Sequence, residues 1–158
     1  MTNFTIREAT DQDREWAARL MAGSEPWVRL GRGYDACLAA CCARDDELYI
    51  GWMDTLPCAF VLVRPRGVAG APYIVSVAVA DPFRSRGFGA SLLSFVERRF
   101  AGHSRHLFLC VSSFNARAQA FYQRHGFAVV GELEDFIIPG AAEILMQKPL
   151  DPRLLGLP

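Results

Sequence analysis

The stretch Val77-Ala-Val-Ala-Asp-Pro-Phe-Arg-Ser-Arg-Gly-Phe-Gly-Ala90 decides the fold class. It joins the end of an apolar segment to a loop with two arginines, and two glycines then open a helix. Free backbone N–H groups at a helix start are electropositive and point at whatever occupies the preceding loop. Glycines let the backbone approach an anion because no Cβ is in the way. The stretch predicts a strand–loop–helix junction able to hold a pyrophosphate, although an ordinary junction fits the glycines alone equally well.

Two common phosphate-binding motifs are excluded by the residues after Gly89. A P-loop requires lysine followed by serine or threonine, whereas Ala90 and Ser91 stand here. The dinucleotide-binding fingerprint requires a third glycine where Leu92 stands. It also requires an acidic residue about 20 positions further on, where the chain has the apolar Leu107–Leu109.

Outward from this junction, hydrophobic periodicity predicts strands that alternate with helices. Tyr73–Val79 contains one polar residue, Ser76, which is typical of a strand covered on both faces. The other expected strands are Phe4–Glu8, Leu48–Met53, Ala59–Val63, Leu107–Val111, Ala128–Glu132 and Glu143–Lys148. The expected helices are 11–21, Tyr34–Cys42, Gly87–Phe100 and Asn115–His125, and Arg64–Pro72, rich in Gly and Pro, is expected to be a loop. This order indicates one α/β domain over residues 1–150, with a short C-terminal tail at 151–158.

Composition excludes several classes of protein. The 158 residues are 51% hydrophobic, which is enough for one sizeable core. The 17 basic and 17 acidic residues cancel, which argues against a nucleic-acid-binding protein. No signal peptide is visible, and the longest apolar run, Tyr73–Ala80, is too short for a bilayer, so we expect a cytoplasmic protein without a membrane partner. The five cysteines form no CxxC pair, and no metal site is expected.

A second motif, Asn115-Ala-Arg-Ala-Gln-Ala-Phe-Tyr-Gln-Arg-His-Gly-Phe127, follows the next expected strand. With it, the sequence resembles the GNAT superfamily of acyl-CoA-dependent N-acetyltransferases. Arg84-x-x-Gly87-x-Gly89 is similar to the family's pyrophosphate motif, and Asn115-x-x-Ala118-x-x-Phe121-Tyr122-x-x-x-Gly126-Phe127 to its second motif. The element order matches the family over Phe4 to Lys148.

This resemblance implies a fold and an activity. The fold would be a single-domain GNAT-like α/β fold, with a mixed, mostly antiparallel sheet of about seven strands and about four flanking helices. The strands at Tyr73–Val79 and Leu107–Val111 would splay apart. The activity would be transfer of an acetyl group from acetyl-CoA to a primary amine by direct attack on the thioester. A non-catalytic acyl-CoA sensor, a longer acyl group and a homodimer stay open as alternatives.

Residues at the matching positions would take the family's roles. The backbone of Val77, Ala78 and Val79 would bond the pantetheine arm like an added strand, and the N–H near Val79 would face the thioester carbonyl. The pyrophosphate would be held by Arg84, Ser85, Arg86, Gly87, Phe88, Gly89 and Ala90. Asn115 would either reach the pantetheine or cap its own helix.

Tyr122 is the expected catalytic residue, because the departing CoA thiolate needs a proton that a phenol can supply. Core packing is the competing interpretation of Tyr122. If Phe127 folds back on the last helical turn, we expect it to pack beside Tyr122.

Many family members carry a glutamate base on the strand before the pyrophosphate loop, and Tyr73–Val79 has no carboxylate. The base could then be water-relayed, or come from Glu132, Glu134 or Asp135, for which a solvated strand edge is the competing interpretation. Trp27 would either wall the acceptor site or pack in the core.

Overall fold

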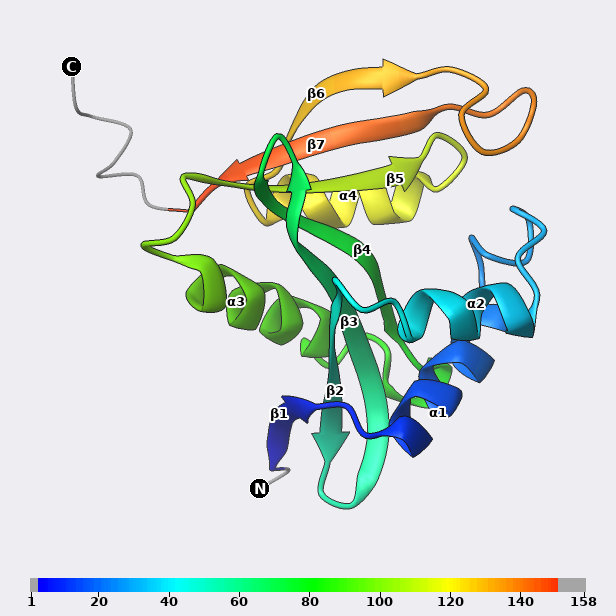
Figure 1. Ribbon diagram of the computed structural model, residues 1–158, viewed down its shortest axis with the longest axis vertical. Coiled ribbons are helices and arrows are strands. Elements are labelled where there is room, and N and C mark those ends of the chain that lie inside the picture. Colours follow the sequence, from blue (N-terminus) through cyan, green and yellow to red (C-terminus); the bar gives the residue numbers. More distant parts are fainter. Residues whose placement is uncertain (1–2, 151–158) are drawn as a thin grey trace.

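The computed structural model describes residues 3–150 and shows one α/β domain built on a seven-stranded sheet (Figure 1). The tail expected at 151–158 lies outside the described residues. Along the chain the elements are β1 (Phe4–Glu8), α1 (Asp11–Ala22), α2 (Tyr34–Cys41), β2 (Glu47–Met53), β3 (Leu56–Val68), β4 (Ala71–Val79), the 3-10 turn η1 (Asp81–Phe83), α3 (Phe88–Phe100), β5 (His106–Ser112), α4 (Ala116–Arg124), β6 (Ala128–Leu133) and β7 (Glu143–Pro149). The expected number, type and order of helices and strands are confirmed.

The sheet order is β1-β2-β3-β4-β5-β7-β6. Every neighbouring pair is antiparallel except β4 and β5, which are parallel. Helices α1 and α2 lie on one face of the sheet, and α3 and α4 on the other (Figure 1). None of these helices, within residues 3–150, is long and apolar enough to cross a membrane.

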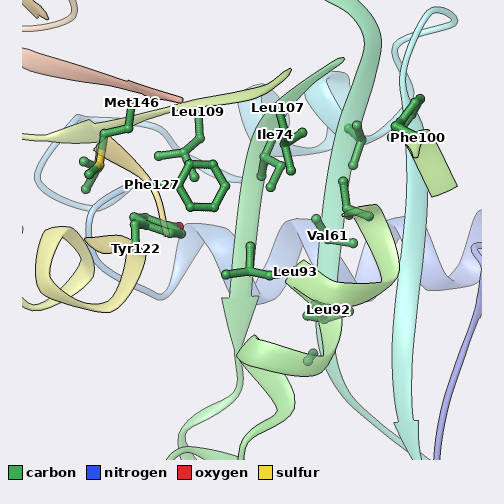
Figure 2. Close-up of a cluster of buried hydrophobic side chains, with 14 of the residues drawn as sticks. Val61, Ile74, Leu92, Leu93, Phe100, Leu107, Leu109, Tyr122, Phe127 and Met146 are labelled. Carbon is green, nitrogen blue, oxygen red and sulfur yellow. The ribbon is translucent and has the colours of Figure 1, made fainter. Parts of the chain in front are cut away.

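Each face of the sheet has its own hydrophobic core. Apolar positions at the helical period bury one side of α3 against β3–β5 and β7, and Figure 2 shows Leu92 and Leu93 of α3 in the same buried cluster as Val61 and Ile74 of the sheet. On the opposite face, α1 and α2 cover β2 and β3 around the fully buried Phe60. Burial of a large apolar side chain contributes about 1.5–3 kcal/mol, so these two cores hold the layers together.

Strands β4 and β5 splay apart soon after they meet, as expected. They pair only at Tyr73↔Phe108 and Ile74↔Leu109. On its other side β4 pairs with β3, but Leu62 faces Ser76 and Val63 faces Ile74, so Val75 is an extra, bulged residue. Beyond this bulge, the edge of β4 that faces β5 has no partner strand among residues 3–150.

One part of the sequence-based expectation was wrong. The predicted loop Arg64–Pro72 belongs to a β-hairpin, in which β3 continues to Val68 and β4 begins at Ala71. The hairpin turns at Ala69 and Gly70, which both have positive φ angles (49° and 83°), as a tight two-residue turn requires. The glycine and proline that suggested a loop occupy an irregular stretch of the ladder between Arg64 and Val68, where no regular pairing is needed.

Candidate active site

A cleft of about 870 Å³ opens where β4 and β5 separate. Its walls come from β4, the loop before α3, the first turn of α3, β5, α4, the β6–β7 connection, the start of β7 and the segment that precedes α2. This volume lies in the range of small-molecule binding sites, about 300–1,000 Å³. The splay thus connects both faces of the sheet through one cleft.

The amino end of α3 faces this cleft without a side-chain cap. Gly87 is the N-cap residue at φ 84°, a left-handed conformation that favours glycine, and the first turn contains no acidic residue. By contrast, α1 begins with a capping box between Thr10 and Asp13, and α4 begins with the side chain of Asn115. The first N–H groups of α3 are therefore left for a ligand, and an anion suits them best.

The two glycines of the junction keep the space at this helix start open. A Cβ at Gly87 would meet no atom within 4 Å, so any side chain there would project into free space. A Cβ at Gly89 would come within 3.2 Å of the Phe121 ring, so a larger residue there would need the ring to shift by a few tenths of an ångström. The residues present fit a bound pyrophosphate in charge and in shape.

The two arginines of the loop behave differently. Arg84 lines the cleft, donates from Nε to the Val79 carbonyl at 3.3 Å and pairs with Asp81 at 2.9 Å. The guanidinium of Arg86 instead reaches Met53 and lies over the Phe83 ring, and Arg86 is not among the cleft-lining residues. All the other predicted cofactor-binding residues line the cleft, namely Val77, Ala78, Val79, Ser85, Gly87, Phe88, Gly89, Ala90 and Asn115.

Asn115 caps α4, since its Oδ1 accepts a hydrogen bond from the Ala118 N–H at 3.1 Å. The other end of α4 closes as the sequence predicts. Gly126 has φ 91°, and the Phe127 N–H donates to the Tyr122 carbonyl at 3.0 Å.

Tyr122 combines core packing with a place in the cleft wall. It is 9% exposed, and its ring packs edge-on against Phe127, with 5.8 Å between ring centroids, as expected (Figure 2). A second edge-on contact joins the ring to Phe121, with 5.4 Å between ring centroids. Burial raises the pKa of the Tyr122 phenol, so the hydroxyl carries its proton at neutral pH.

The segment before α2 forms one wall on the α1 and α2 face. Trp27 lines the cleft and also packs against Phe60, with ring centroids 6.4 Å apart. Core packing therefore describes its position, and its role toward an acceptor stays a prediction. Further along, the Arg29 guanidinium lies 4.1 Å from the Phe114 ring centre and connects this segment to the loop after β5.

The three acidic residues expected near the acceptor lie elsewhere. Glu132, Glu134 and Asp135 are exposed, and none of them lines the cleft. Asp135 Oδ1 accepts a hydrogen bond from the Gly140 N–H at 2.7 Å and so stabilises the β6–β7 connection.

Glu143, at the start of β7, is the carboxylate that sequence reasoning missed. It lines the cleft with only 6% of its surface exposed. Its Oε1 accepts a hydrogen bond from Ser112 Oγ at 3.1 Å, and its buried Oε2 has no hydrogen-bond partner among residues 3–150. Burial raises the pKa of Glu143, against smaller opposing effects of Ser112 and Arg32. A signal was present in the sequence, since Glu143 is a charged residue leading directly into the apolar Ile144–Met146.

Comparisons with known proteins bear on the same residues. The sequence model described as the acetyltransferase (GNAT) family matches residues 7–127, which include both the α3 junction and the α4 motif. A search of curated proteins finds no match.

Solved structures share the fold at low sequence identity. A protein from Desulfovibrio desulfuricans assigned to the GNAT family superposes with a TM-score of 0.82, at 19% identity over 94% of this chain and 100% of that chain. An aminoglycoside 6'-N-acetyltransferase complexed with coenzyme A gives 0.78, at 14% identity over 94% and 98%. The Escherichia coli ribosomal-protein-S18-alanine N-acetyltransferase gives 0.74, at 18% identity over 94% and 95%. With the family match over most of the sequence and the fold shared across whole chains, this chain belongs to the acetyltransferase (GNAT) family.

Proposed function

We propose that the protein is an N-acetyltransferase that moves the acetyl group of acetyl-CoA to a primary amine by direct attack on the thioester. The observation that carries this proposal is that the uncapped start of α3 and the side chain of Tyr122 line one cleft. An anion site and a proton donor in the same cleft suit a co-substrate with a pyrophosphate at one end and a thioester at the other.

Each part of the cleft has a task in this reaction. Backbone N–H groups of α3, with Arg84 beside them, would hold the pyrophosphate. The unpaired edge of β4 at Val77–Val79 would hydrogen-bond the amide groups of the pantetheine arm, and one N–H there would stabilise the negative charge that develops on the thioester oxygen. When bound, acetyl-CoA supplies an activated acetyl group.

Tyr122 would donate the proton that the departing sulfur needs. Its buried ring is held between Phe121 and Phe127, which restricts the direction in which the phenol can point. A positioned general acid contributes about 10²–10⁴-fold to a rate.

Release of free CoA thiol from acetyl-CoA, measured with a panel of primary amines, tests the proposal. We expect at least one amine to give turnover, and Tyr122→Phe to lower kcat by about 10²–10⁴-fold. Tyr49→Phe is the matched control, because Tyr49 is a partly buried tyrosine outside the cleft whose hydroxyl binds Glu47 at 2.7 Å. An unchanged kcat in Tyr122→Phe would place the proton donor elsewhere, and silence across the panel despite acetyl-CoA binding would instead favour the sensor.

A homodimer and a cytoplasmic location stay predictions. The edge strand β6 supports the homodimer, because Val129 and Val130 on its two faces are 52% and 49% exposed.

A further inference from the structure

The charged residues that line the cleft include Glu143 and Arg32, beside Glu25, Arg84, Arg117 and Arg124. We propose that this part of the cleft binds an amphoteric amine, an amino-acid-like small molecule whose ammonium group is held by Glu143 and whose carboxylate is held by Arg32. The proposal rests on the proposed function and names the acceptor class.

The carboxylate of Glu143 is only half satisfied. Oε1 accepts the Ser112 hydroxyl at 3.1 Å, whereas the buried Oε2 has no partner within residues 3–150. Because an ionised carboxylate that is buried without full hydrogen bonding costs free energy, such a group calls for a ligand that supplies the missing donor. An ammonium group supplies both the donor and the opposite charge.

Three ionisable groups on neighbouring elements act on Glu143, and none of them donates the hydrogen bond that its Oε2 lacks. They are Tyr73 on β4, Cys110 on β5 and Arg32 before α2. Burial raises the pKa of Tyr73 and of Cys110, so both are neutral near neutral pH and neither neutralises the carboxylate. Arg32 is the cation of this set.

Arg32 lines the same cleft as Glu143 but is not paired with it. Its charge lowers the pKa of Glu143, yet no ion pair within 4.0 Å links Arg32 to an acidic residue in the part of the chain that the structure describes. Its backbone is fixed, because the Arg32 N–H donates to the Trp27 carbonyl at 3.0 Å and the Arg32 carbonyl accepts from Cys37 Sγ at 3.7 Å. A guanidinium on a fixed backbone can bind a carboxylate through two parallel hydrogen bonds.

The charges and walls of this region select among amines. A polyamine would bring a second positive charge toward Arg32, and an amine within a polypeptide lacks the neighbouring carboxylate. A free amino acid presents both groups within one small molecule. The apolar side chains of Trp27, Leu30 and Ile137 line the same cleft and can contact the rest of the acceptor.

Glu143 would also start the reaction by taking a proton from the ammonium group. The freed nitrogen lone pair forms the C–N bond to the acetyl carbon, and the C–S bond breaks with its electron pair leaving on sulfur. Tyr122 gives that sulfur a proton, and the second nitrogen proton restores the phenol through solvent. When Glu143 releases its proton to water, an ammonium and a thioester have become an amide, a thiol and one proton.

A panel of proteinogenic amino acids, each beside its carboxamide and its decarboxylated amine, tests the acceptor class by CoA thiol release. We expect a free amino acid to be the best acceptor, with kcat/KM about 10- to 100-fold above that of its carboxamide, because the amide loses the charge-assisted bonds to Arg32. Arg32→Gln should remove most of this preference. Arg19→Gln, an exposed arginine on α1 outside the cleft, should retain it.

Binding without acetyl-CoA provides a second readout. Calorimetric titration of the preferred amino acid into the protein alone should show at least about tenfold weaker affinity in both Glu143→Gln and Arg32→Gln. Glu143→Gln should also lower kcat/KM about 10²–10⁴-fold with every amine, and the remaining activity should lack the ascending limb of the pH profile, which reports a base that must lose its proton. Both variants should keep the thermal stabilisation that acetyl-CoA gives the unmodified protein.

The outcomes separate this inference from the proposed function. Equal or better turnover with carboxamides or decarboxylated amines, or no turnover with any free amino acid, would overturn the amphoteric acceptor. If polyamines or peptide amines then released CoA, the protein would still be an N-acetyltransferase. If acetyl-CoA neither bound nor reacted, the proposed function itself would be lost.

Discussion

Glu143 shows a conflict between stability and function at the level of a single residue. The side chain is 6% exposed and one of its oxygens has no partner among residues 3–150. Folding therefore removes water from a carboxylate without replacing all of its hydrogen bonds. Buried carboxylates with an unpaired oxygen are often functional, because the oxygen that destabilises the fold is available to a ligand.

This conflict predicts that Glu143→Gln stabilises the protein near neutral pH. Because burial raises the pKa of Glu143 in the folded state, the folded protein binds this proton more tightly than the unfolded chain does. Stability then falls as pH rises from the ordinary carboxyl value of 4.5 through the raised folded value. Glutamine keeps an oxygen for Ser112 and carries no charge, so we expect a higher free energy of unfolding at neutral pH.

Urea unfolding at pH about 4 and about 7.5 measures this effect, with the gain present only at the higher pH. Glu134→Gln is the control, since Glu134 is exposed in the β6–β7 connection and should change little at either pH. A loss of stability in Glu143→Gln at neutral pH would mean that the carboxylate is satisfied in solution.

At the level of elements, the helix starts differ in their caps. Helix α2, like α3, begins at a glycine without a side-chain cap, but its N-cap Gly33 does not line the cleft. Helices α1 and α4 begin with side-chain caps from Thr10 and Asn115, whereas α3 begins at Gly87 with none. A glycine N-cap costs only a few tenths of a kcal/mol relative to a side-chain cap. Among the helices within residues 3–150, α3 combines an uncapped start with a place in the cleft wall, so we expect its free N–H groups to bind an anion.

Gly87→Leu is therefore expected to abolish the thermal shift that acetyl-CoA produces. The leucine side chain would project from the start of α3 into the open space that the pyrophosphate needs. Gly102→Leu is a matched control, because Gly102 has a similar φ of 81°, also has free space around its Cβ position and lies outside the cleft. Both variants should lose about 1–2 kcal/mol of stability from the left-handed backbone, which differential scanning measures without ligand.

Only the loss of the acetyl-CoA shift should distinguish the two glycine variants. A shift retained in Gly87→Leu would contradict the assignment of the α3 start as the pyrophosphate site. Equal loss of the shift in both variants would indicate a general effect on folding.

For the whole molecule, the split between β4 and β5 places the cleft between two parts of one sheet. A ligand in it touches β4 and α3 on one side and β5 and α4 on the other. Binding to the folded state alone stabilises it by mass action, about 2.7 kcal/mol at a ligand concentration of 100 times Kd. For a chain of this size, we expect acetyl-CoA at that concentration to raise Tm by about 5–11 °C.

Thermal unfolding at increasing acetyl-CoA concentrations checks this shift. S-acetyl-N-acetylcysteamine is a suitable control ligand, since it carries the thioester but no pyrophosphate, and its shift at equal concentration should be much smaller. Absence of a shift with acetyl-CoA at high concentration would contradict co-substrate binding in the cleft.

Much of the fold followed from local patterns. The helices at Asp11–Ala22 and Phe88–Phe100 are specified by caps, glycines and apolar periodicity within a few residues, and the Gly126 helix end likewise depends on neighbours along the chain. The predicted loop at Arg64–Pro72 failed because glycine and proline mark loops and sheet irregularities alike, and only the pairing of β3 with β4 distinguishes them.

The sequence by itself determined the order of elements, the glycine start of α3 and the motif around Tyr122, because each depends on residues that are close along the chain. Only the tertiary structure decided which carboxylate lies in the cleft. Glu143 contacts Ser112 because β5 and β7 pair antiparallel and bring together two residues that are 31 positions apart. Glu132, Glu134 and Asp135 lie outside the cleft. The position of the Arg86 side chain likewise depends on the tertiary structure, because its guanidinium contacts Met53, which is distant in the sequence. Side-chain direction and long-range register depend on packing between elements, which no local spacing encodes.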